Sequence, residues 1–245
     1  MIDAITEAKR AEGCSNATVS RTLALIRAIL RKCARDWEWL ERAPAVRLLK
    51  EPTPRIRFLS RDQARTLLRE LPAHLRDMAS FTLATGLRAA NVTGLTWEQV
   101  DLSRKLAWIH PDQAKARRAI AVPLNDTAMQ VVRSQVGRHP VRVFTYEGKP
   151  VRQVSTAAWY KALARAGVGD FRWHDLRHTW ACWHVQGGTP LFALQELAGW
   201  GPRRWCDVTH ISPRNIWRST PPTRKVTAQI RHNHRTSAAQ PDCKW

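Results

Sequence analysis

The first clear pattern along the chain is a stripe of apolar residues at helical spacing. Between residues 16 and 37, apolar side chains recur at steps of three and four: Val19, Leu23, Ile26, Leu30, Cys33 and Trp37. Such a stripe is typical of an amphipathic helix that buries one face. Asn16 or Thr18 is a suitable N-cap, because a short polar side chain accepts hydrogen bonds from the first helical turn. We therefore predict a helix over residues 16–37.

Basic residues of the same segment lie mainly off the apolar stripe: Arg21, Arg27, Arg31, Lys32 and Arg35. One interpretation is an ordinary solvated face. The other is a helix face that lies along a phosphate backbone, because arginine and lysine supply many of the contacts to phosphate oxygens. The pattern leaves both interpretations open, and these residues are our candidates for nucleic-acid contact.

A basic, proline-rich stretch then interrupts the pattern and divides the chain. Residues 44–57 contain three prolines and four basic residues, and proline cannot continue a helix. We interpret residues 51–58 as a linker. It separates a first domain at residues 1–50 from a second domain at residues 59–200.

We expect the second domain to be mostly helical with a small sheet. Ser60 and Gln63 form a capping-box pattern at its start. Apolar spacing and capping residues predict further helices at 74–87, 125–136, 153–166, 173–187 and 189–199. Residues 105–110 and 119–124 are rich in strand formers and are joined by a basic turn, which predicts an antiparallel hairpin. The predicted fold class is therefore mainly α with a small antiparallel β-sheet (α+β).

Residues 201–245 differ from the rest of the chain. They are rich in arginine, proline and tryptophan, and they show no sustained helical or strand periodicity. A packed element would need such a periodicity to bury one face. We therefore predict an aberrant and poorly ordered tail.

The net charge indicates a polyanionic partner. Forty Lys and Arg residues against twenty Asp and Glu residues give a charge of +20, which points most simply to nucleic acid. Hydrophobic residues make up 44% of the chain, so wholesale disorder is excluded. No apolar run reaches the roughly 18 residues of a membrane helix, and the first residues predict no secretory signal. Five scattered cysteines form no disulfide framework, which suits a reducing cytosol.

Three short segments carry the candidate chemistry, together with Lys115 in the basic turn. They are Ala84-Thr-Gly-Leu-Arg88, His174-Asp-Leu-Arg177-His178 and Leu194-Gln-Glu-Leu-Ala-Gly-Trp200. Each has an ordinary interpretation when it is taken alone. His174 and His178 could share a helix face with Cys182 and bind a metal ion, but a fourth ligand is not apparent in the sequence.

Taken together and in this order, the segments resemble the tyrosine recombinase (phage integrase) family, from about residue 16 to Trp200. The resemblance implies a helical core-binding domain and a mostly helical catalytic domain that clamp double-stranded DNA. The first domain is short for the family, so we expect a truncated start. The implied activity is site-specific DNA recombination without metal or cofactor. The family works as a tetrameric synapse on DNA, in the bacterial or phage cytoplasm at the nucleoid. Its members lock together through their C-terminal helix, which the tail of this chain does not match, so we expect weak or absent assembly here.

The resemblance also assigns a role to each matching residue. Arg88 and Arg177 match the two arginines that bind the scissile phosphate, for which paired guanidinium groups are suited. Lys115 matches the general acid that protonates the leaving 5′-oxygen. His174 matches the histidine that assists proton transfer. Trp200 falls where the family has His or Trp, and its indole N–H is a donor to the phosphate.

The family's nucleophile has no match in this chain. Family members carry a tyrosine shortly after the position of Trp200, which attacks phosphorus and forms a 3′-phosphotyrosyl link. That spacing falls on Val208 or Thr209 here. The tyrosines of the chain are Tyr146 and Tyr160, which we place at the end of a strand and in a helix, far upstream of the expected position.

A shift of the reading frame accounts for this loss. Residues 204–210 can be encoded so that a frame displaced by one nucleotide reads Met-Val-Arg-Arg-Tyr-Ala. The tyrosine codon would then straddle Val208 and Thr209. We hypothesise a single-nucleotide insertion or deletion soon after codon 200, as a lesion of the gene or an error of its sequence.

Three functional readings follow from the sequence. The first is a site-specific recombinase by ancestry that binds DNA but is unable to cleave it as written. The second is an active enzyme that takes its tyrosine from a different protein. The third is a non-catalytic DNA-binding protein that occupies or blocks recombination sites. The set of Arg88, Lys115, His174 and Arg177 favours the first over the third, because binding alone would not retain it.

Overall fold

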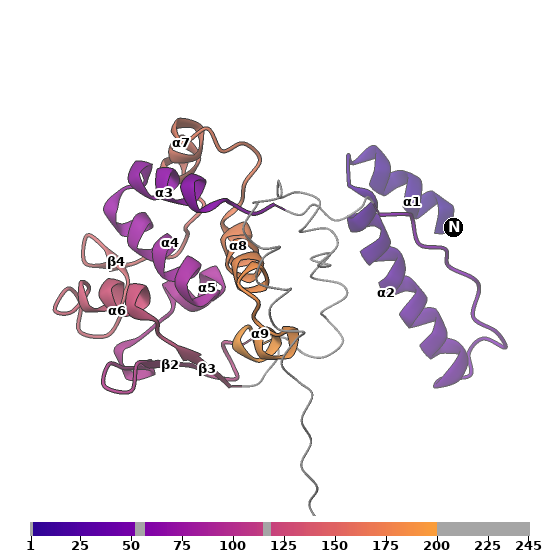
Figure 1. The fold of residues 1–245 in the computed structure, drawn as a ribbon. Coiled ribbons are helices and arrows are strands. Elements are labelled where there is room, and N and C mark those ends of the chain that lie inside the picture. Colours follow the sequence, from indigo (N-terminus) through magenta and orange to yellow (C-terminus); the bar gives the residue numbers. More distant parts are fainter. Residues whose placement is uncertain (1, 52–56, 115–118, 200–245) are drawn as a thin grey trace, which may run out of the picture. The chain divides into compact units, whose positions relative to one another are not determined.

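The computed structural model describes residues 2–51, 57–114 and 119–199. These residues form two compact units, one before residue 52 and one after residue 56. Figure 1 shows the helices and strands of both units.

The first unit consists of two helices and an extended segment. Helix α1 spans Ile2–Ala11 and helix α2 spans Asn16–Arg35. Val19 and Leu23 of α2 are buried together with Val46 of the extended segment. Because the apolar stripe has a partner surface, the amphipathic helix predicted here is confirmed.

Two details of this unit differ from the prediction. The N-cap of α2 is Ser15, whose hydroxyl accepts a hydrogen bond from the Thr18 amide, so the proposed caps were wrong. Asn16 instead donates its side-chain amide to the Lys50 carbonyl at 3.0 Å. The helix ends at Arg35, and Trp37 is therefore an exposed residue beyond it.

The second unit is mainly helical. Its α-helices are α3 (Arg61–Glu70), α4 (Ala73–Thr85), α5 (Ala89–Thr93), α6 (Asp126–Arg133), α7 (Ala157–Arg165), α8 (Trp173–Gln186) and α9 (Leu191–Leu197). Helix α4 packs against both α6 and α8, and α3 packs against α7. Large side chains such as Phe81, Trp159 and Leu176 fill the shared core.

Two small antiparallel sheets complete this unit. Strands β1 (Val100–Asp101), β2 (Leu106–Ile109) and β3 (Ile120–Pro123) pair in that order. The predicted hairpin is confirmed as β2 and β3, and β1 adds a strand that the sequence pattern did not predict. Strands β4 (Thr145–Tyr146) and β5 (Lys149–Pro150) form the second hairpin. The fold class is mainly α with a small antiparallel sheet, as predicted.

Helix boundaries follow capping chemistry closely. At the start of α3, Ser60 and Gln63 each accept the other's backbone amide, at 3.1 Å and 3.0 Å. Helix α4 ends at Gly86, which takes the left-handed conformation at φ 67°. The predicted segments 125–136 and 153–166 are shorter in the structure. Helix α6 begins after its N-cap Asn125 and ends at Arg133, and helix α7 begins after its N-cap Thr156 and ends at Arg165.

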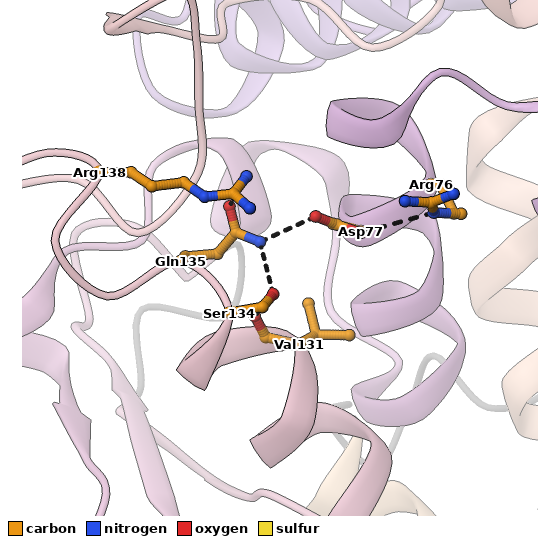
Figure 2. Close-up of polar contacts among 6 residues, drawn as sticks. All are labelled: Arg76, Asp77, Val131, Ser134, Gln135 and Arg138. Carbon is orange, nitrogen blue, oxygen red and sulfur yellow. Dashed lines mark hydrogen bonds and ion pairs between the residues drawn. The ribbon is translucent and has the colours of Figure 1, made fainter.

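A polar network joins α4 to α6 inside this core (Figure 2). The buried Gln135 donates its side-chain amide to Asp77 at 2.8 Å and to Ser134 at 2.9 Å. Arg138 donates in turn to the Gln135 carbonyl oxygen at 3.2 Å. Because both ends of its side-chain amide are hydrogen-bonded, the cost of taking Gln135 out of water is largely offset.

Within the described ranges, no helix combines the length and the apolar character that crossing a membrane requires.

Candidate active site

Three of the residues proposed for catalysis lie in the described part of the second unit. Arg88 is the N-cap residue of α5. His174 and Arg177 both lie near the start of α8. Lys115 and Trp200 lie outside the described residues, as do Val208 and Thr209, where the tyrosine is expected.

The candidate DNA-contact residues all lie on α2 of the first unit. Four of them are exposed and Arg27 is half-buried. The four exposed residues are Arg21, Arg31, Lys32 and Arg35. Arg35 is paired with the neighbouring Asp36 at 2.7 Å, and the Lys32 ammonium lies 5.2 Å from the Trp37 ring centroid. The basic face of this helix is therefore accessible to solvent.

Arg88 directly follows the tight turn that ends α4. The amide of Gly86 donates to the Thr82 carbonyl at 2.8 Å and closes the helix. The carbonyl of Ala84, in the last turn of α4, accepts a hydrogen bond from the side-chain amide of Asn125 at 3.2 Å. The last turn of α4 is therefore fixed from within the helix and from the start of α6.

Arg177 joins this turn to the end of α9. Its side chain is buried, with 3% of the residue exposed. One terminal nitrogen donates to the Gly86 carbonyl, and the other donates to the Ala198 carbonyl at 2.6 Å. Gly86 and Ala198 are the C-cap residues of α4 and α9. The three sequence segments that carry the family resemblance thus meet at one guanidinium group.

The end of α9 is also fixed against the sheet. Gly199 takes the left-handed conformation at φ 58°, and a Cβ there would overlap the Ile120 side chain of β3. Helix α9 packs on β3 accordingly (Figure 1). By sequence, Lys115 lies in the connection between β2 and β3, and Trp200 follows Gly199 directly. The described scaffold therefore anchors the chain on both sides of the segment that contains Lys115, and directly before Trp200.

The charges of the site act on one another. Burial and the charge of Arg88 lower the pKa of Arg177 to about 9. Burial, His178, Arg177 and Arg88 lower the pKa of His174 to about 4, and only Asp175 opposes them. His174 is therefore a neutral imidazole near pH 7. Burial and the charge of Arg88 therefore act in the same direction on the pKa values of Arg177 and His174.

Helix α8 also carries the residues considered as metal ligands. The rings of His174 and His178 meet edge to face, with centroids 4.9 Å apart. Cys182 is buried, and burial raises the pKa of its thiol to about 12, which disfavours the thiolate that a metal ion needs. Over the described ranges, no three His, Cys, Asp or Glu side chains form a group suited to a metal ion.

Two supporting residues were not singled out for the site from the sequence. Asn125 was identified only as a helix cap, and its contact with Ala84 spans 41 positions. Trp180 lies with its ring against Gly86. The spacing of Trp180 from Arg177 by one helical turn is visible in the sequence, and it is the one signal that places both side chains on the same helix face.

Comparison with known proteins identifies the family of this chain. A model of the phage integrase family matches residues 57–204. The integrase of Salmonella phage P22 is 42% identical over 217 residues, which cover 82% of this chain and 55% of that protein. The chain thus spans about half the length of this relative.

Solved structures share the fold at low sequence identity. The Tn1549 transposon integrase, in complex with a circular intermediate DNA, has a TM-score of 0.69 and 15% identity, covering 95% of this chain and 85% of that one. A lambda integrase dimer bound to a COC′ core site has a TM-score of 0.64 and 17% identity, covering 81% and 77%. With the family match over residues 57–204 and the 42% identity to the P22 protein, the chain belongs to the phage integrase family.

Proposed function

We propose that this chain carries the phosphate-binding machinery of a site-specific DNA recombinase, with Arg88 and Arg177 on either side of one scissile phosphate. The supporting observation is the buried Arg177, whose fork is oriented by the carbonyls of Gly86 and Ala198. Its pKa is lowered by the charge of Arg88, so the two guanidinium groups repel each other. A bound phosphate dianion or diester would relieve that repulsion and would accept hydrogen bonds from both.

Double-stranded DNA is the proposed partner. The net charge of +20 favours a polyanion, and the exposed basic residues of α2 are candidates for further backbone contacts. The lambda integrase, which shares the fold, has been solved as a tetramer bound to a Holliday junction. We accordingly propose that the family's working form is a DNA-bound tetramer and that this chain, whose tail does not match the family's C-terminal segment, assembles weakly. The proposed location is the cytoplasm, at the nucleoid.

The proposed chemistry distributes its steps over several side chains. A tyrosine oxygen attacks phosphorus, and the bond to the 5′-oxygen breaks. Arg88 and Arg177 stabilise the negative charge that grows on the non-bridging oxygens. Neutral His174 takes the phenolic proton, and Lys115 supplies a proton to the leaving oxygen. In this scheme Trp200 donates its indole N–H to the phosphate.

The tyrosine is the missing part of this scheme. Tyr146 stacks its ring on His74 at a centroid distance of 4.1 Å, at the first turn of α4. The site lies at the opposite end of α4, twelve residues and about 18 Å further along the helix axis. Tyr146 therefore lies too far away to attack a phosphate held by Arg177. We propose that the chain as written binds DNA and does not cleave it.

Covalent trapping tests this proposal. The chain is incubated with nicked duplexes that carry recombination sites of phage P22 type, and denaturing gels then reveal any protein–DNA adduct. We expect salt-sensitive binding without an adduct. An adduct whose mass spectrum maps to Tyr146 or Tyr160 would contradict the proposal.

Resequencing the gene across codons 195–215 tests the frame shift itself. If the corrected frame places a tyrosine at Val208 or Thr209, its product should form the adduct, and an Arg88→Ala variant of that product should not. If the given sequence is confirmed, the chain is a recombinase without its nucleophile. An adduct that still forms with Arg88→Ala would argue against the assigned role of this arginine.

A further inference from the structure

A small pocket opens on the second unit where α3, α4, α6 and α8 meet. Its volume of about 240 Å³ is room for about eight waters at roughly 30 Å³ each, which suits a molecule of one or two rings. Its walls include Trp180 and Trp183 of α8, Arg61 of α3 and Asn125 at the start of α6. The described residues of the proposed catalytic site do not line it, so this pocket is a separate feature.

Polar contacts hold the aromatic wall of the pocket in place. The indole N–H of Trp183 donates to the Leu59 carbonyl at 3.0 Å, which fixes the orientation of its ring. The rings of Trp180 and His184 meet edge to face, with centroids 4.7 Å apart. His184 in turn shares a hydrogen bond of 3.0 Å with the Thr189 hydroxyl. Because these rings are already ordered, a ligand that packs on them loses little affinity to the cost of ordering side chains.

Arg61 supplies a permanent positive charge at the rim of the pocket. The central carbon of its guanidinium lies 3.7 Å from the centroid of the Trp183 ring, so the planar cation stacks on the ring face. Its N–H groups lie in the guanidinium plane and are not used by the ring. Arg61 is exposed and forms no ion pair with a carboxylate of the described residues, because its neighbour Asp62 pairs with Arg65. These N–H groups therefore remain for a carboxylate.

The rest of the described lining carries no charge at neutral pH. No Asp or Glu belongs to it. His184 adds no second cation, because burial and the charge of Arg61 lower its pKa below the ordinary value. A ligand therefore meets two indole rings and one guanidinium group. The rings favour a flat apolar body, and the guanidinium favours a single negative charge on that body.

We propose that this pocket binds a small planar aromatic carboxylate, with its carboxylate paired to Arg61 and its ring packed against Trp180 and Trp183. Such a ligand satisfies the cation and covers the indole rings in one step. A pocket of mostly apolar wall with one oriented charged group is typical of small-molecule sites. The site takes no part in the proposed DNA chemistry, so the inference goes beyond the proposed function.

A bound ligand would act on the turn that leads to Arg88. Trp180 packs against Gly86, and Asn125 donates to the Ala84 carbonyl in the last turn of α4. The two side chains thus line the pocket and also hold the end of α4. A ligand that binds only while they are in place stabilises this arrangement by mass action. We therefore assign the pocket the role of an effector site for this turn.

Calorimetric titration of the full chain with three matched compounds tests the ligand class. Indole-3-carboxylate has the ring and the charge, indole-3-carboxamide has the ring alone, and cyclohexanecarboxylate has the charge alone. We expect a Kd of about 0.1–1 mM for the first compound. Binding should be about tenfold weaker for the carboxamide and about three- to tenfold weaker for cyclohexanecarboxylate. If either control compound binds as tightly as indole-3-carboxylate, or if none binds, the inference is overturned.

Arg61→Gln removes the cation from the rim, and Arg65→Gln is its matched control. Both residues are exposed on α3, and Arg65 does not line the pocket. We expect Arg61→Gln to weaken binding of indole-3-carboxylate about tenfold and to leave binding of the carboxamide unchanged. Arg65→Gln should bind both compounds as the wild-type chain does. Equal affinities of the two variants for indole-3-carboxylate would show that Arg61 is not its partner, and the inference would fail.

Amide hydrogen exchange tests the effect on the turn. The Gly86 amide, which donates to the Thr82 carbonyl, reports on the end of α4, and the Val168 amide, which donates to Leu163 after α7, is the control. At about ten times the Kd of indole-3-carboxylate, we expect exchange at Gly86 to slow by up to about tenfold and exchange at Val168 to stay the same. Equal changes at both amides, or none, would overturn the effector role. Since no DNA enters these experiments, their failure would leave the proposed function standing.

Discussion

The ring of Trp180 occupies the space in which a side chain on Gly86 would begin. Trp180 follows Arg177 by one turn of α8, so both side chains point from the same helix face toward the end of α4. One fills the space beside the Gly86 α-carbon, and the other binds the Gly86 carbonyl. The turn that leads to Arg88 is therefore shaped by close packing as well as by hydrogen bonds.

Replacing Gly86 with alanine should destabilise the fold markedly. The new Cβ would overlap the Trp180 ring, and the backbone has φ 67°, which L-residues disfavour. We expect a loss of about 2–4 kcal/mol in the free energy of unfolding by urea denaturation. Gly167→Ala is the control, because Gly167 has φ 65° with no atom within 4 Å of the added Cβ. Equal losses in the two variants would show that the Trp180 contact contributes nothing.

Replacing Arg177 with lysine should also destabilise the fold, although the charge is kept. A single ammonium group cannot reproduce the fork that reaches Gly86 and Ala198, and buried carbonyls would lose their donors. The expected loss is about 2–4 kcal/mol in the same measurement.

Arg165→Lys is the matched control for Arg177→Lys. Arg165 also uses its fork, donating to the Glu70 carboxylate and the Glu70 carbonyl at 2.6 Å each, but it is exposed to solvent. We expect its replacement to cost less than about 1 kcal/mol. If both variants lost the same stability, burial of the Arg177 fork would not be the reason for its effect.

The stability of the fold should fall as the pH is lowered below neutrality. The pKa of His174 is lowered to about 4 in the folded chain, and it is about 6.5 in an unfolded chain. Between these values the unfolded chain binds a proton that the folded chain does not, so the free energy of unfolding decreases with falling pH. Urea midpoints compared at neutral pH and near the lower pKa measure this decrease.

A His174→Gln variant should show a flatter pH dependence than the wild-type chain. Part of the slope will remain, because burial also lowers the pKa of His178 and of His184. His110→Gln, at an exposed position, should keep the wild-type profile. If the His174→Gln and His110→Gln profiles were indistinguishable, the lowered pKa of His174 would not be a source of the pH dependence.

Asn125 should contribute through two separable contacts. Its carbonyl oxygen caps α6 by accepting the Ala128 amide at 2.9 Å, and its amide group donates to Ala84. Asn125→Ala removes both, and we expect a loss of about 1–2 kcal/mol. Asn125→Asp keeps the capping acceptor and should lose less, as measured by thermal or urea unfolding. An aspartate variant as unstable as the alanine variant would exclude a contribution from the cap.

The sequence predicted those elements whose signals are local. The apolar stripe of α2, the capping box at Ser60 and the strand-forming runs of β2 and β3 each determine their own conformation. Helix α5 and the β4–β5 hairpin were not predicted. Helix α5 has five residues, too few for a helical period, and the hairpin turn is Glu-Gly rather than a more typical Asn-Gly. Helix α1 was not predicted either, and it buries no residue completely.

In the candidate site, too, the residues in short motifs were predicted and their long-range contacts were not. Arg88, His174 and Arg177 were identified through their short motifs, which are contiguous in sequence. Their supports were not predictable, because they are contacts between distant segments. Arg177 reaches Gly86 across 91 positions and Ala198 across 21. No periodicity or spacing in the sequence encodes which backbone carbonyl will face a buried guanidinium group.

The carbonyl pair that holds Arg177 has a consequence for local unfolding. If the end of α9 detached from the second unit, a buried cation would lose one of its two carbonyl partners, and the Gly86 turn would have to adjust. The last turns of α4 and α9 should therefore open together, as one cooperative unit in amide hydrogen exchange. Opening of the end of α9 would then also open the turn that leads to Arg88, although the two lie 110 positions apart in the chain.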